Sequence, residues 1–332
     1  MRRGLMRDAR VVLPLAAALG LAGCGAGTAL AGVHDAPTQA TNQAPISPES
    51  AQRVVERVLA AADEADHAKP DAAKDLRVAA LTGAALAVAT ASDQLGRSAA
   101  TVPDPISRSK PPTVLAVSRG TGWPRLIVAQ TVTDDGGSAL NLLVSPDART
   151  PFRLAARASM HPGASVSALD PLTKGSLVVT EGANLVKAPQ DLLAEYAAGL
   201  AFPKPAKAPD IDGSDQFTIG VKANAAAQAK SFGKLATLTQ KHQVQPDQTI
   251  AIQLRGGGAL VFALLQRTDT ITLKKGGKSL TPSAQFQRLV HKKTLRKNAE
   301  LKSYETVVLT VPEQGTATVV AADEVLFSAK GA

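Results

Sequence analysis

The residue with the most definite chemistry in this sequence is Cys24, the only cysteine among 332 residues. Its thiolate is a nucleophile that can accept a covalent group. The residues before it carry four arginines and then a short apolar run, residues 11–20. A basic start, a short apolar run and small residues before a cleavage point make up a secretory signal. The run is well short of the roughly 20 residues that a membrane-spanning helix needs. The pattern therefore predicts an export leader over residues 1–23.

The tetrapeptide Leu21-Ala22-Gly23-Cys24 resembles the lipobox of bacterial lipoproteins. The resemblance implies cleavage before Cys24, a diacylglycerol on its sulfur and, often, a fatty acyl group on the new amine. We therefore expect a mature protein that its lipid anchors to the extracytoplasmic face of the cell membrane. A single cysteine has no partner for an internal disulfide, so a hydrophobic core has to hold the fold.

Two further motifs are similar to sites for phosphate binding or acyl transfer, but both are incomplete. Gly276-Gly277-Lys278-Ser279 matches the end of a phosphate-binding loop, yet Thr272 stands where that loop needs its first glycine. Serine-x-x-lysine pairs begin at Ser107 and Ser231, as in penicillin-interacting enzymes, but the later elements of such sites do not follow. We interpret the first motif as a β-turn and expect no catalysis at either serine.

Metal-binding patterns are incomplete as well. Asp210, Asp212 and Asp215 loosely resemble a calcium loop, but Val221 occupies the position of the bidentate glutamate. The histidines have no ligand spacing, and we expect them at the surface: His34, His67, His161, His242 and His291. The sequence therefore predicts no metal, no cofactor and no enzyme activity.

Positive charge is concentrated in one late segment. The chain has a formal net charge of +9, and residues 274–302 contribute +8 because Glu300 is their only acid. The basic residues are Lys274, Lys275, Lys278, Arg288, Lys292, Lys293, Arg296, Lys297 and Lys302. Near an anionic surface each contributes on the order of 1 kcal/mol. The segment either contacts an anionic lipid, a wall polymer or an envelope protein, or it is a solvated helix and hairpin without a partner.

Composition narrows the class of partner. Hydrophobic residues make up 45% of the chain, enough for a core, but aromatic residues make up only 3%. Single-stranded nucleic acid is bound largely by stacking of bases on aromatic side chains, and an exported protein does not meet nucleic acid. We therefore expect no nucleic-acid partner.

Apolar periodicity locates the expected elements of the first half. Residues 24–46 have too few apolar side chains to fold and predict a tether. A helix with one apolar stripe is expected from Ser47, with Pro48 in its first turn. More helix follows over residues 71–98, interrupted near Gly83. Short β runs come next, at residues 113–118, 125–131, 139–145, 152–160 and 176–180.

The same order recurs in the second half. Helices are expected over residues 191–200 and 221–242, and strands at residues 249–254, 259–273, 304–311 and 317–327. Arg119-Gly120-Thr121-Gly122 and Arg255-Gly256-Gly257-Gly258 each link two β runs at a sequence offset of 136 residues. Repetition of this kind indicates tandem units.

Helices followed by a curved antiparallel sheet, twice over, resemble tandem NTF2-like or cystatin-like domains. We therefore expect two α+β domains, residues 47–182 and 183–332. The mature chain also resembles an uncharacterised family of actinobacterial lipoproteins with two such halves. That resemblance is carried by Trp123-Pro124-Arg125, Pro151-Phe152-Arg153-Leu154-Ala155-Ala156, Phe262-Ala263-Leu264-Leu265-Gln266-Arg267-Thr268-Asp269 and Val320-Ala321-Ala322-Asp323-Glu324. It implies a location and a fold but no chemistry.

These observations favour a lipid-anchored envelope protein that serves as a non-catalytic binding or scaffold module. The alternative is a carrier that holds a lipid or an apolar small molecule in the cone of one domain. Such a carrier needs an open apolar pocket of roughly a few hundred Å³. A wall-acting hydrolase is a third candidate, which buried Asp–His or Asp–Tyr groups would favour.

Overall fold

The computed structural model describes residues 42–96, 110–133, 136–179, 184–275, 277 and 279–331. These residues belong to one compact unit, Gln39–Ala332. The expected leader, Cys24 and most of the expected tether lie outside the described residues, as do Lys278 and the expected boundary at residues 182 and 183. None of the described helices is both long and apolar enough to cross a membrane.

The first half begins with three helices, α2 (Pro48–His67), α3 (Pro70–Ala80) and α4 (Gly83–Leu95). The Ser47 side chain caps α2 by accepting a hydrogen bond from the Ser50 amide, which satisfies one of the free amides at a helix start. One face of α2 is buried, through Ala51, Val55, Val58, Leu59, Ala62 and Ala65. The expected helices and the interruption between them are confirmed.

The first sheet is an antiparallel meander in the order β1-β2-β3-β4. Its strands are β1 (Thr113–Val117), β2 (Arg125–Val132), β3 (Ser138–Ser145) and β4 (Arg153–Ser159), which confirms four of the expected runs. The fifth, at residues 176–180, is wrong for its described part. Ser176 and Val178 form only single bridges, to Ser118 and to Ile252. The segment therefore pairs with two different sheets and builds no ladder with either.

The second half opens with α5 (Pro189–Gly199) and α6 (Gln216–Phe232). The helix expected over residues 221–242 is wrong beyond the end of α6. Gly233 follows α6 with a φ of 53°, a backbone conformation that glycine adopts without strain. The next element, β6 (Ala236–Val244), begins with every second residue buried. That period of two belongs to a strand with one covered face.

The second sheet has the order β5-β10-β9-β8-β6, and β7 pairs with β8 as well. Its other strands are β5 (Ile211–Asp212), β7 (Ile250–Gln253), β8 (Ala259–Leu273), β9 (Asn298–Val311) and β10 (Ala317–Gly331). β6 and β7 are separated by a 3-10 turn, Pro246–Gln248, and pair with successive parts of β8. The short helix α7 (Ala284–Val290) follows β8. The expected strands are confirmed, although β9 starts earlier than expected.

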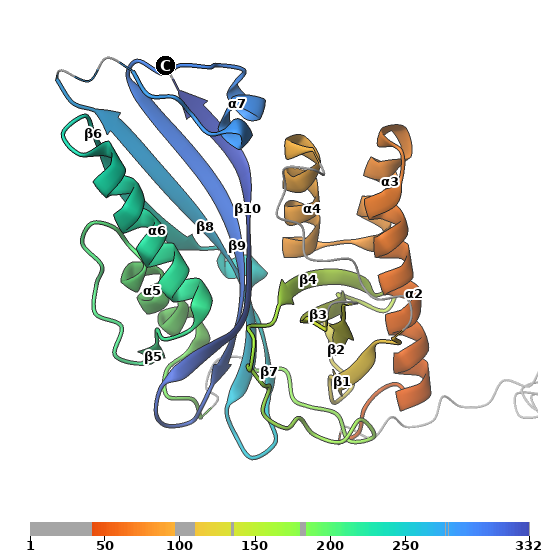
Figure 1. Ribbon diagram of the computed structural model, residues 1–332. Helices are drawn as coiled ribbons and strands as arrows, with labels where there is room; N and C mark the ends of the chain where they lie inside the picture. The colour runs from red at the N-terminus through yellow and green to blue at the C-terminus, as the bar shows by residue number, and fades with distance from the viewer. Residues whose placement is uncertain are drawn as a thin grey trace, which may run out of the picture. The chain divides into compact units, whose positions relative to one another are not determined.

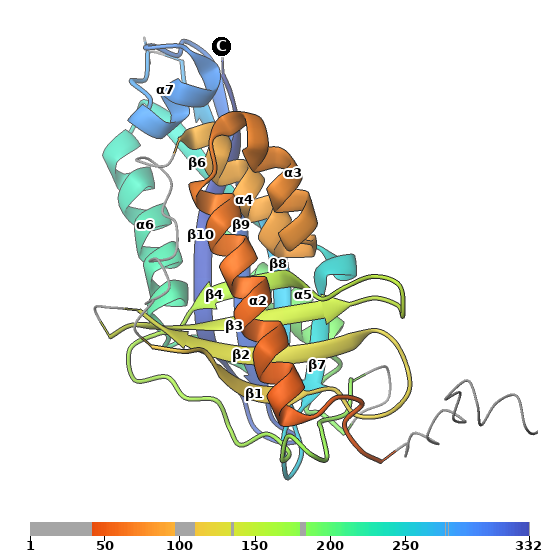
Figure 2. The ribbon, with the colours of Figure 1, turned by 90° about the vertical axis from the view of Figure 1, so that its right-hand side faces the viewer.

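The two sheets pack face to face, with α2 on the outer side of the first and α5 and α6 on the outer side of the second (Figures 1 and 2). α4 lies beside the first sheet and packs against β10. α2 contributes Leu59 to a cluster with Ile127 and Leu143 of the first sheet. α5 and α6 contribute Leu192 and Val221 to a cluster on the second sheet. The layers are therefore helix, sheet, sheet and helix, and the fold is α+β with antiparallel sheets.

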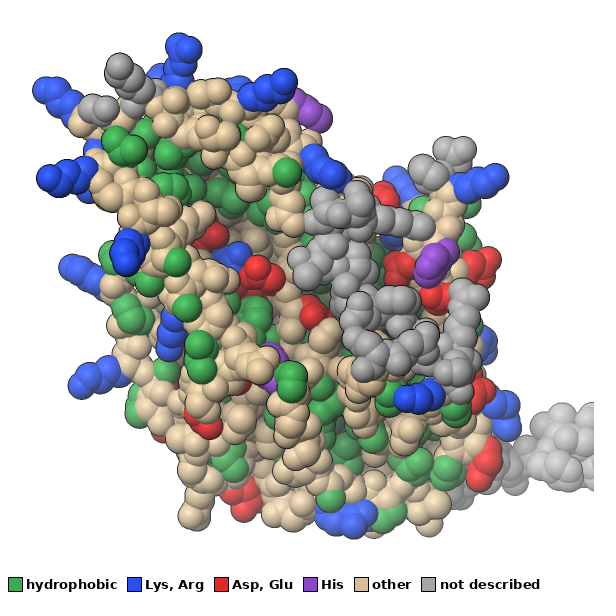
Figure 3. Space-filling view, viewed as in Figure 1, with side chains coloured by type: hydrophobic (Ala, Val, Ile, Leu, Met, Phe, Trp, Pro, Cys, Tyr) green, Lys and Arg blue, Asp and Glu red, His purple; other side chains and the backbone are tan. Residues whose placement is uncertain are grey.

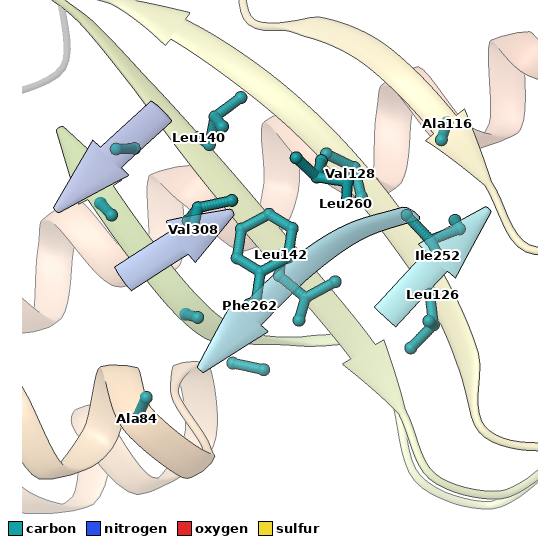
Figure 4. Close-up of a cluster of buried hydrophobic side chains, with 14 of the residues drawn as sticks. Ala84, Ala116, Leu126, Val128, Leu140, Leu142, Ile252, Leu260, Phe262 and Val308 are labelled. Atoms are coloured by element: carbon teal, nitrogen blue, oxygen red, sulfur yellow. The ribbon is translucent and has the colours of Figure 1, made fainter. Parts of the chain in front are cut away.

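The core between the sheets draws side chains from both halves of the chain (Figure 4). Leu126, Leu140 and Leu142 of the first sheet share a cluster with Leu260 and Phe262 of the second. Each of these five side chains is at most 2% exposed. Buried apolar surface stabilises a fold by about 25 cal/mol per Å², so this shared layer is a main source of stability for both halves.

Candidate functional site

Most of the basic residues predicted from the sequence gather at one end of the second sheet. We call this surface the basic end. Its described members are Lys274, Lys275, Arg288, Lys292, Lys293, Arg296, Lys297 and Lys302. They come from the segment after β8, from α7, from the loop behind it and from β9. Figure 1 shows these segments together at the top, beside the C-terminus.

Apolar contacts hold the basic end in place. Ser283 caps α7 by accepting a hydrogen bond from the Phe286 amide. The Phe286 ring is buried in a cluster with Leu295 and Ile271. Leu280 and Leu295 exchange two backbone hydrogen bonds, of 2.8 and 2.9 Å. The segment therefore turns its few apolar side chains inward and leaves its basic side chains outside.

Most cations of the basic end are exposed and keep their charge unneutralised. Seven of the eight are exposed, and Lys302 is half-buried, 3.8 Å from Glu300. Arg288 and Lys292 each donate a hydrogen bond of 2.9 Å to a backbone carbonyl. The five others form no ion pair with a described residue: Lys274, Lys275, Lys293, Arg296 and Lys297. Their charge is available to a partner of opposite sign.

The basic surface extends beyond the predicted segment. α6 and β6 with the turn between them add four exposed lysines: Lys222, Lys230, Lys234 and Lys241. Figure 3 shows Lys and Arg side chains along the upper and left-hand sides, over α7, β6 and α6. Charge counting along the chain missed these lysines because α6 and β6 precede residues 274–302. The sequence nevertheless contains a signal for this wider basic surface, because Asp247 and Asp269 are the only acids between residues 216 and 299.

A second group of charged residues lies on the outer face of the second sheet. We call it the buried ion cluster, and it consists of His242, Arg267, Asp269, Glu305 and Glu324. The Arg267 guanidinium lies 3.1 Å from Glu305 and 3.2 Å from Asp269, and it also pairs with Glu324. His242 Nδ1 lies 2.7 Å from Glu305 Oε2. The cluster therefore connects β6, β8, β9 and β10 through side chains.

The neighbouring carboxylates stabilise the positive charge of Arg267. Burial lowers the pKa of the Arg267 guanidinium, but the neighbouring carboxylates, Glu305 first, outweigh burial and hold that pKa above its ordinary value. The side chains of His242 and Glu305 are both 0% exposed. The expectation of a surface histidine is therefore wrong for His242, because α5 and α6 pack against this face of the sheet at β6.

The histidine expectation is also wrong for His161, which joins the two halves of the chain. His161 Nε2 lies 3.5 Å from Asp215 Oδ1, and the two side chains are 13% and 4% exposed. Asp215 caps α6 by accepting a hydrogen bond from the Thr218 amide, and the Thr218 hydroxyl lies 2.9 Å from the Tyr196 hydroxyl. Burial raises the pKa of Tyr196. Burial also lowers the pKa of His161, although Asp215 opposes this shift.

The structure encloses the His242–Glu305 pair. A general acid or base must come within hydrogen-bond reach of its substrate, and the side chains of His242 and Glu305 are both 0% exposed. The predicted serine motif at Ser107 lies outside the described residues. In the two others, Ser231 donates to the Gln228 carbonyl, and Asp212 accepts from the Ser214 amide. Among the described residues, no group of three or more His, Cys, Asp or Glu side chains could hold a metal ion.

A surface hollow of about 480 Å³ lies where α2 ends and α3 begins. Its lining includes four charged or titratable side chains, which are Asp63, Glu64, His67 and Lys69. It lies among helices and not between the two sheets. Its mixed lining differs from the apolar pocket that a carrier needs.

The helix, sheet, sheet and helix layers define a two-sheet α+β protein with a charged end. A family model described as "Domain of unknown function (DUF8094)" matches residues 43–331. The chain therefore belongs to this family, and the match covers both halves as one unit. Comparisons with curated proteins and with solved structures give no match.

Loss of the central cation of the buried ion cluster should destabilise the fold. Arg267→Ala leaves Glu305 buried without its positive partner, a change that typically costs about 3–5 kcal/mol. We expect the free energy of unfolding, measured with urea, to fall by this amount. Lys293→Ala, at the exposed basic end, should change it by no more than about 0.5 kcal/mol. Equal effects of the two substitutions would contradict a structural role for the cluster.

His161 should make stability depend on pH. In the folded protein its pKa lies below the ordinary value, so between that value and about 6.5 the unfolded chain binds a proton that the folded chain does not. The free energy of unfolding of the wild type should therefore fall relative to His161→Gln as the pH drops from about 7.5 to about 5. Parallel pH profiles of the two proteins would show that His161 contributes no such dependence.

Proposed function

We propose that this protein is a lipid-anchored, extracytoplasmic binding module of the cell envelope without catalytic activity. Its contact with the envelope is the basic end, which meets an anionic component. The observation that carries this proposal is the set of exposed cations that no described carboxylate neutralises. The lipobox-like sequence at Cys24 supports the location.

The arrangement of the cations suits contact with a charged surface. Each Lys or Arg near such a surface contributes on the order of 1 kcal/mol, but only within a Debye length of about 8–10 Å. Cations therefore act together only if they lie on one face. The loop after α7 provides four of them in six residues: Lys292, Lys293, Arg296 and Lys297. None of these four forms an ion pair with a described residue.

The packing between the sheets favours a module over a carrier. Leu142, Leu260 and Phe262 are 2% exposed or less and occupy the space between the two sheets. The surface hollow beside α2 has a mixed, partly charged lining. In the described part of the chain, the carrier alternative is therefore left without a supporting observation. The inaccessible His242–Glu305 pair likewise supports a protein without catalysis.

We also propose that the two halves are tandem copies of one NTF2-like unit. Both Arg-Gly tetrapeptides lie in hairpin turns, one between β1 and β2 and the other between β7 and β8. Each half places helices before a run of four antiparallel strands, β1 to β4 and β7 to β10. The shared order of elements and the matching turns support duplication, with β5 and β6 as additions in the second copy.

Removal of the lipid acceptor should release the protein from the membrane. In the Cys24→Ala variant no thiol remains to carry the diacylglycerol, so the body should move from the membrane fraction to the soluble fraction. Immunoblots of fractionated cells measure this directly. Retention of the variant in the membrane fraction would overturn the anchor, and a neutral substitution such as Thr28→Ala is the matched control.

Neutralising the basic end should weaken binding to anionic surfaces. We expect Lys292→Gln, Lys293→Gln, Arg296→Gln and Lys297→Gln together to reduce binding of the Cys24→Ala protein to anionic vesicles at low salt by at least about tenfold. Co-sedimentation with the vesicles measures this affinity.

The matched control removes the same charge from another surface. Arg53→Gln, Arg57→Gln, Lys69→Gln and Lys74→Gln lie at exposed positions of α2 and at the start of α3. This variant should bind as well as the parent protein. Equal losses in both variants would mean that net charge alone, and not the basic end, governs the contact.

A further inference from the structure

The chain enters the folded body at the end opposite the basic end. The Gln43 carbonyl accepts a hydrogen bond of 3.1 Å from the Gly120 amide, and the Ala44 amide donates one of 3.2 Å to the Thr173 carbonyl. Figures 1 and 2 both show the start of α2 at the bottom and α7 at the top. We call the surface around Gln43, Gly120 and Thr173 the entry end.

The length of β8, a long strand of the second sheet, gives the distance between these two ends. The loop that includes Thr173 also bonds to residues just before β8, where the Arg255 amide donates to the Ala168 carbonyl. β8 then runs from Ala259 to Leu273, next to the first lysine of the basic end. Fourteen steps of about 3.3 Å give roughly 46 Å between the entry end and the basic end.

We propose that the basic end binds a linear, phosphate-bearing polyanion that lies away from the membrane holding the lipid. The protein would then bridge that membrane and the polymer. This inference rests on the proposed function, because it takes the lipid at Cys24 and the anionic contact at the basic end as given. It adds the direction in which the contact points and the chemical class of the partner.

Chain length supports this direction. Seventeen residues separate Cys24 from Asn42, and the tether that the sequence predicts there would have a mean reach of about 23 Å. For an upright body to turn its basic end to the same membrane, Asn42 would have to stand about 46 Å away from it. That is twice the mean reach and most of the fully extended length of about 60 Å. The entropy lost by such stretching opposes this orientation.

The charges at the two ends indicate where an anionic partner binds. The hairpin turns of the second sheet at the entry end carry Arg255 and Glu313, both exposed and of opposite sign. The basic end carries five exposed cations without an ion pair to a described residue, and Lys222, Lys230, Lys234 and Lys241 continue this surface along α6 and β6. An anionic partner is therefore attracted to the basic end and not to the entry end.

The spread and type of the cations indicate the partner. They extend over α7, β6 and α6, which suits an elongated polymer better than a single headgroup. Lysine, which predominates here, binds phosphate as a point charge. The chain has few aromatic side chains for stacking on sugars or bases. A repeating phosphate is thus the group that this surface recognises.

The test uses the lipidated, full-length protein in vesicles that contain anionic lipid. Because Cys24 carries the lipid, a cysteine introduced at exposed Thr294 or at exposed Thr121 is the only free thiol for a fluorophore. Energy transfer to a dye in the headgroup layer should be strong from Thr121→Cys, at the entry end. It should be at least about threefold weaker from Thr294→Cys, at the basic end, because transfer falls steeply over the roughly 46 Å between the two ends. Linear polyphosphate should float with the vesicles only when the protein is present.

Recruitment of polyphosphate should fall at least tenfold with Lys292→Gln, Lys293→Gln, Arg296→Gln and Lys297→Gln and should be unchanged in the α2 and α3 control variant. Equal transfer from both labels, or no recruitment of polyphosphate by the wild type, overturns the inference. Equal recruitment of poly-glutamate overturns the assignment to phosphate.

The outcomes separate this inference from the proposed function. If the Cys24→Ala protein binds anionic vesicles through its basic end, but the lipidated protein brings Thr294→Cys to its own membrane, the proposed function stands and the bridging orientation falls. If the basic end binds neither vesicles nor polyphosphate, the proposed function itself falls.

Discussion

The apolar layer between the two sheets is the constraint on which the rest of the structure depends. Each sheet is antiparallel, a type that commonly keeps one face in water, yet here both faces are covered. Leu142 and Phe262 close the inner layer, and Leu143 and Leu192 belong to the outer layers beneath the helices. Because the inner layer takes side chains from both halves, neither half can bury its sheet without the other. The match of one family model to residues 43–331 accords with this mutual dependence.

The buried ion cluster is the counterpart of that apolar layer on the outer face of the second sheet. Burying charge is costly unless each group is paired, and Arg267 meets this demand with three carboxylates: Asp269 on its own strand, Glu305 on β9 and Glu324 on β10. Such pairing fixes the register of β8 against β9 and β10, since a shift by one residue would turn Glu305 to the opposite face. The side chains of His242 and Glu305 are enclosed in this pairing, whereas the cations of the basic end are exposed.

The separation of the entry end from the basic end is the basis for the direction that we infer for the anionic contact. A cluster of lysines on an anchored protein would ordinarily be assigned to the nearest anionic membrane. The length of β8 and the position where the chain enters the body place that cluster far from the entry end. The function that we infer from this separation is a link between two envelope layers, with the lipid on one side and the cations on the other.

Elements whose signals are local follow from the amino-acid sequence alone. Ser47 and Pro48 marked the start of α2, and periodicity located β8, because capping and side-chain period depend on near neighbours alone. Local signals fail where distant segments decide. The alanines that precede β6 favour a helix there, and the helices that cover the second sheet bury the His242 side chain. Likewise, the lysines of α6 and residues 274–302 form one surface only because tertiary packing brings these segments together. Charge and apolar period are properties of a segment, but burial and direction depend on which segments pack together.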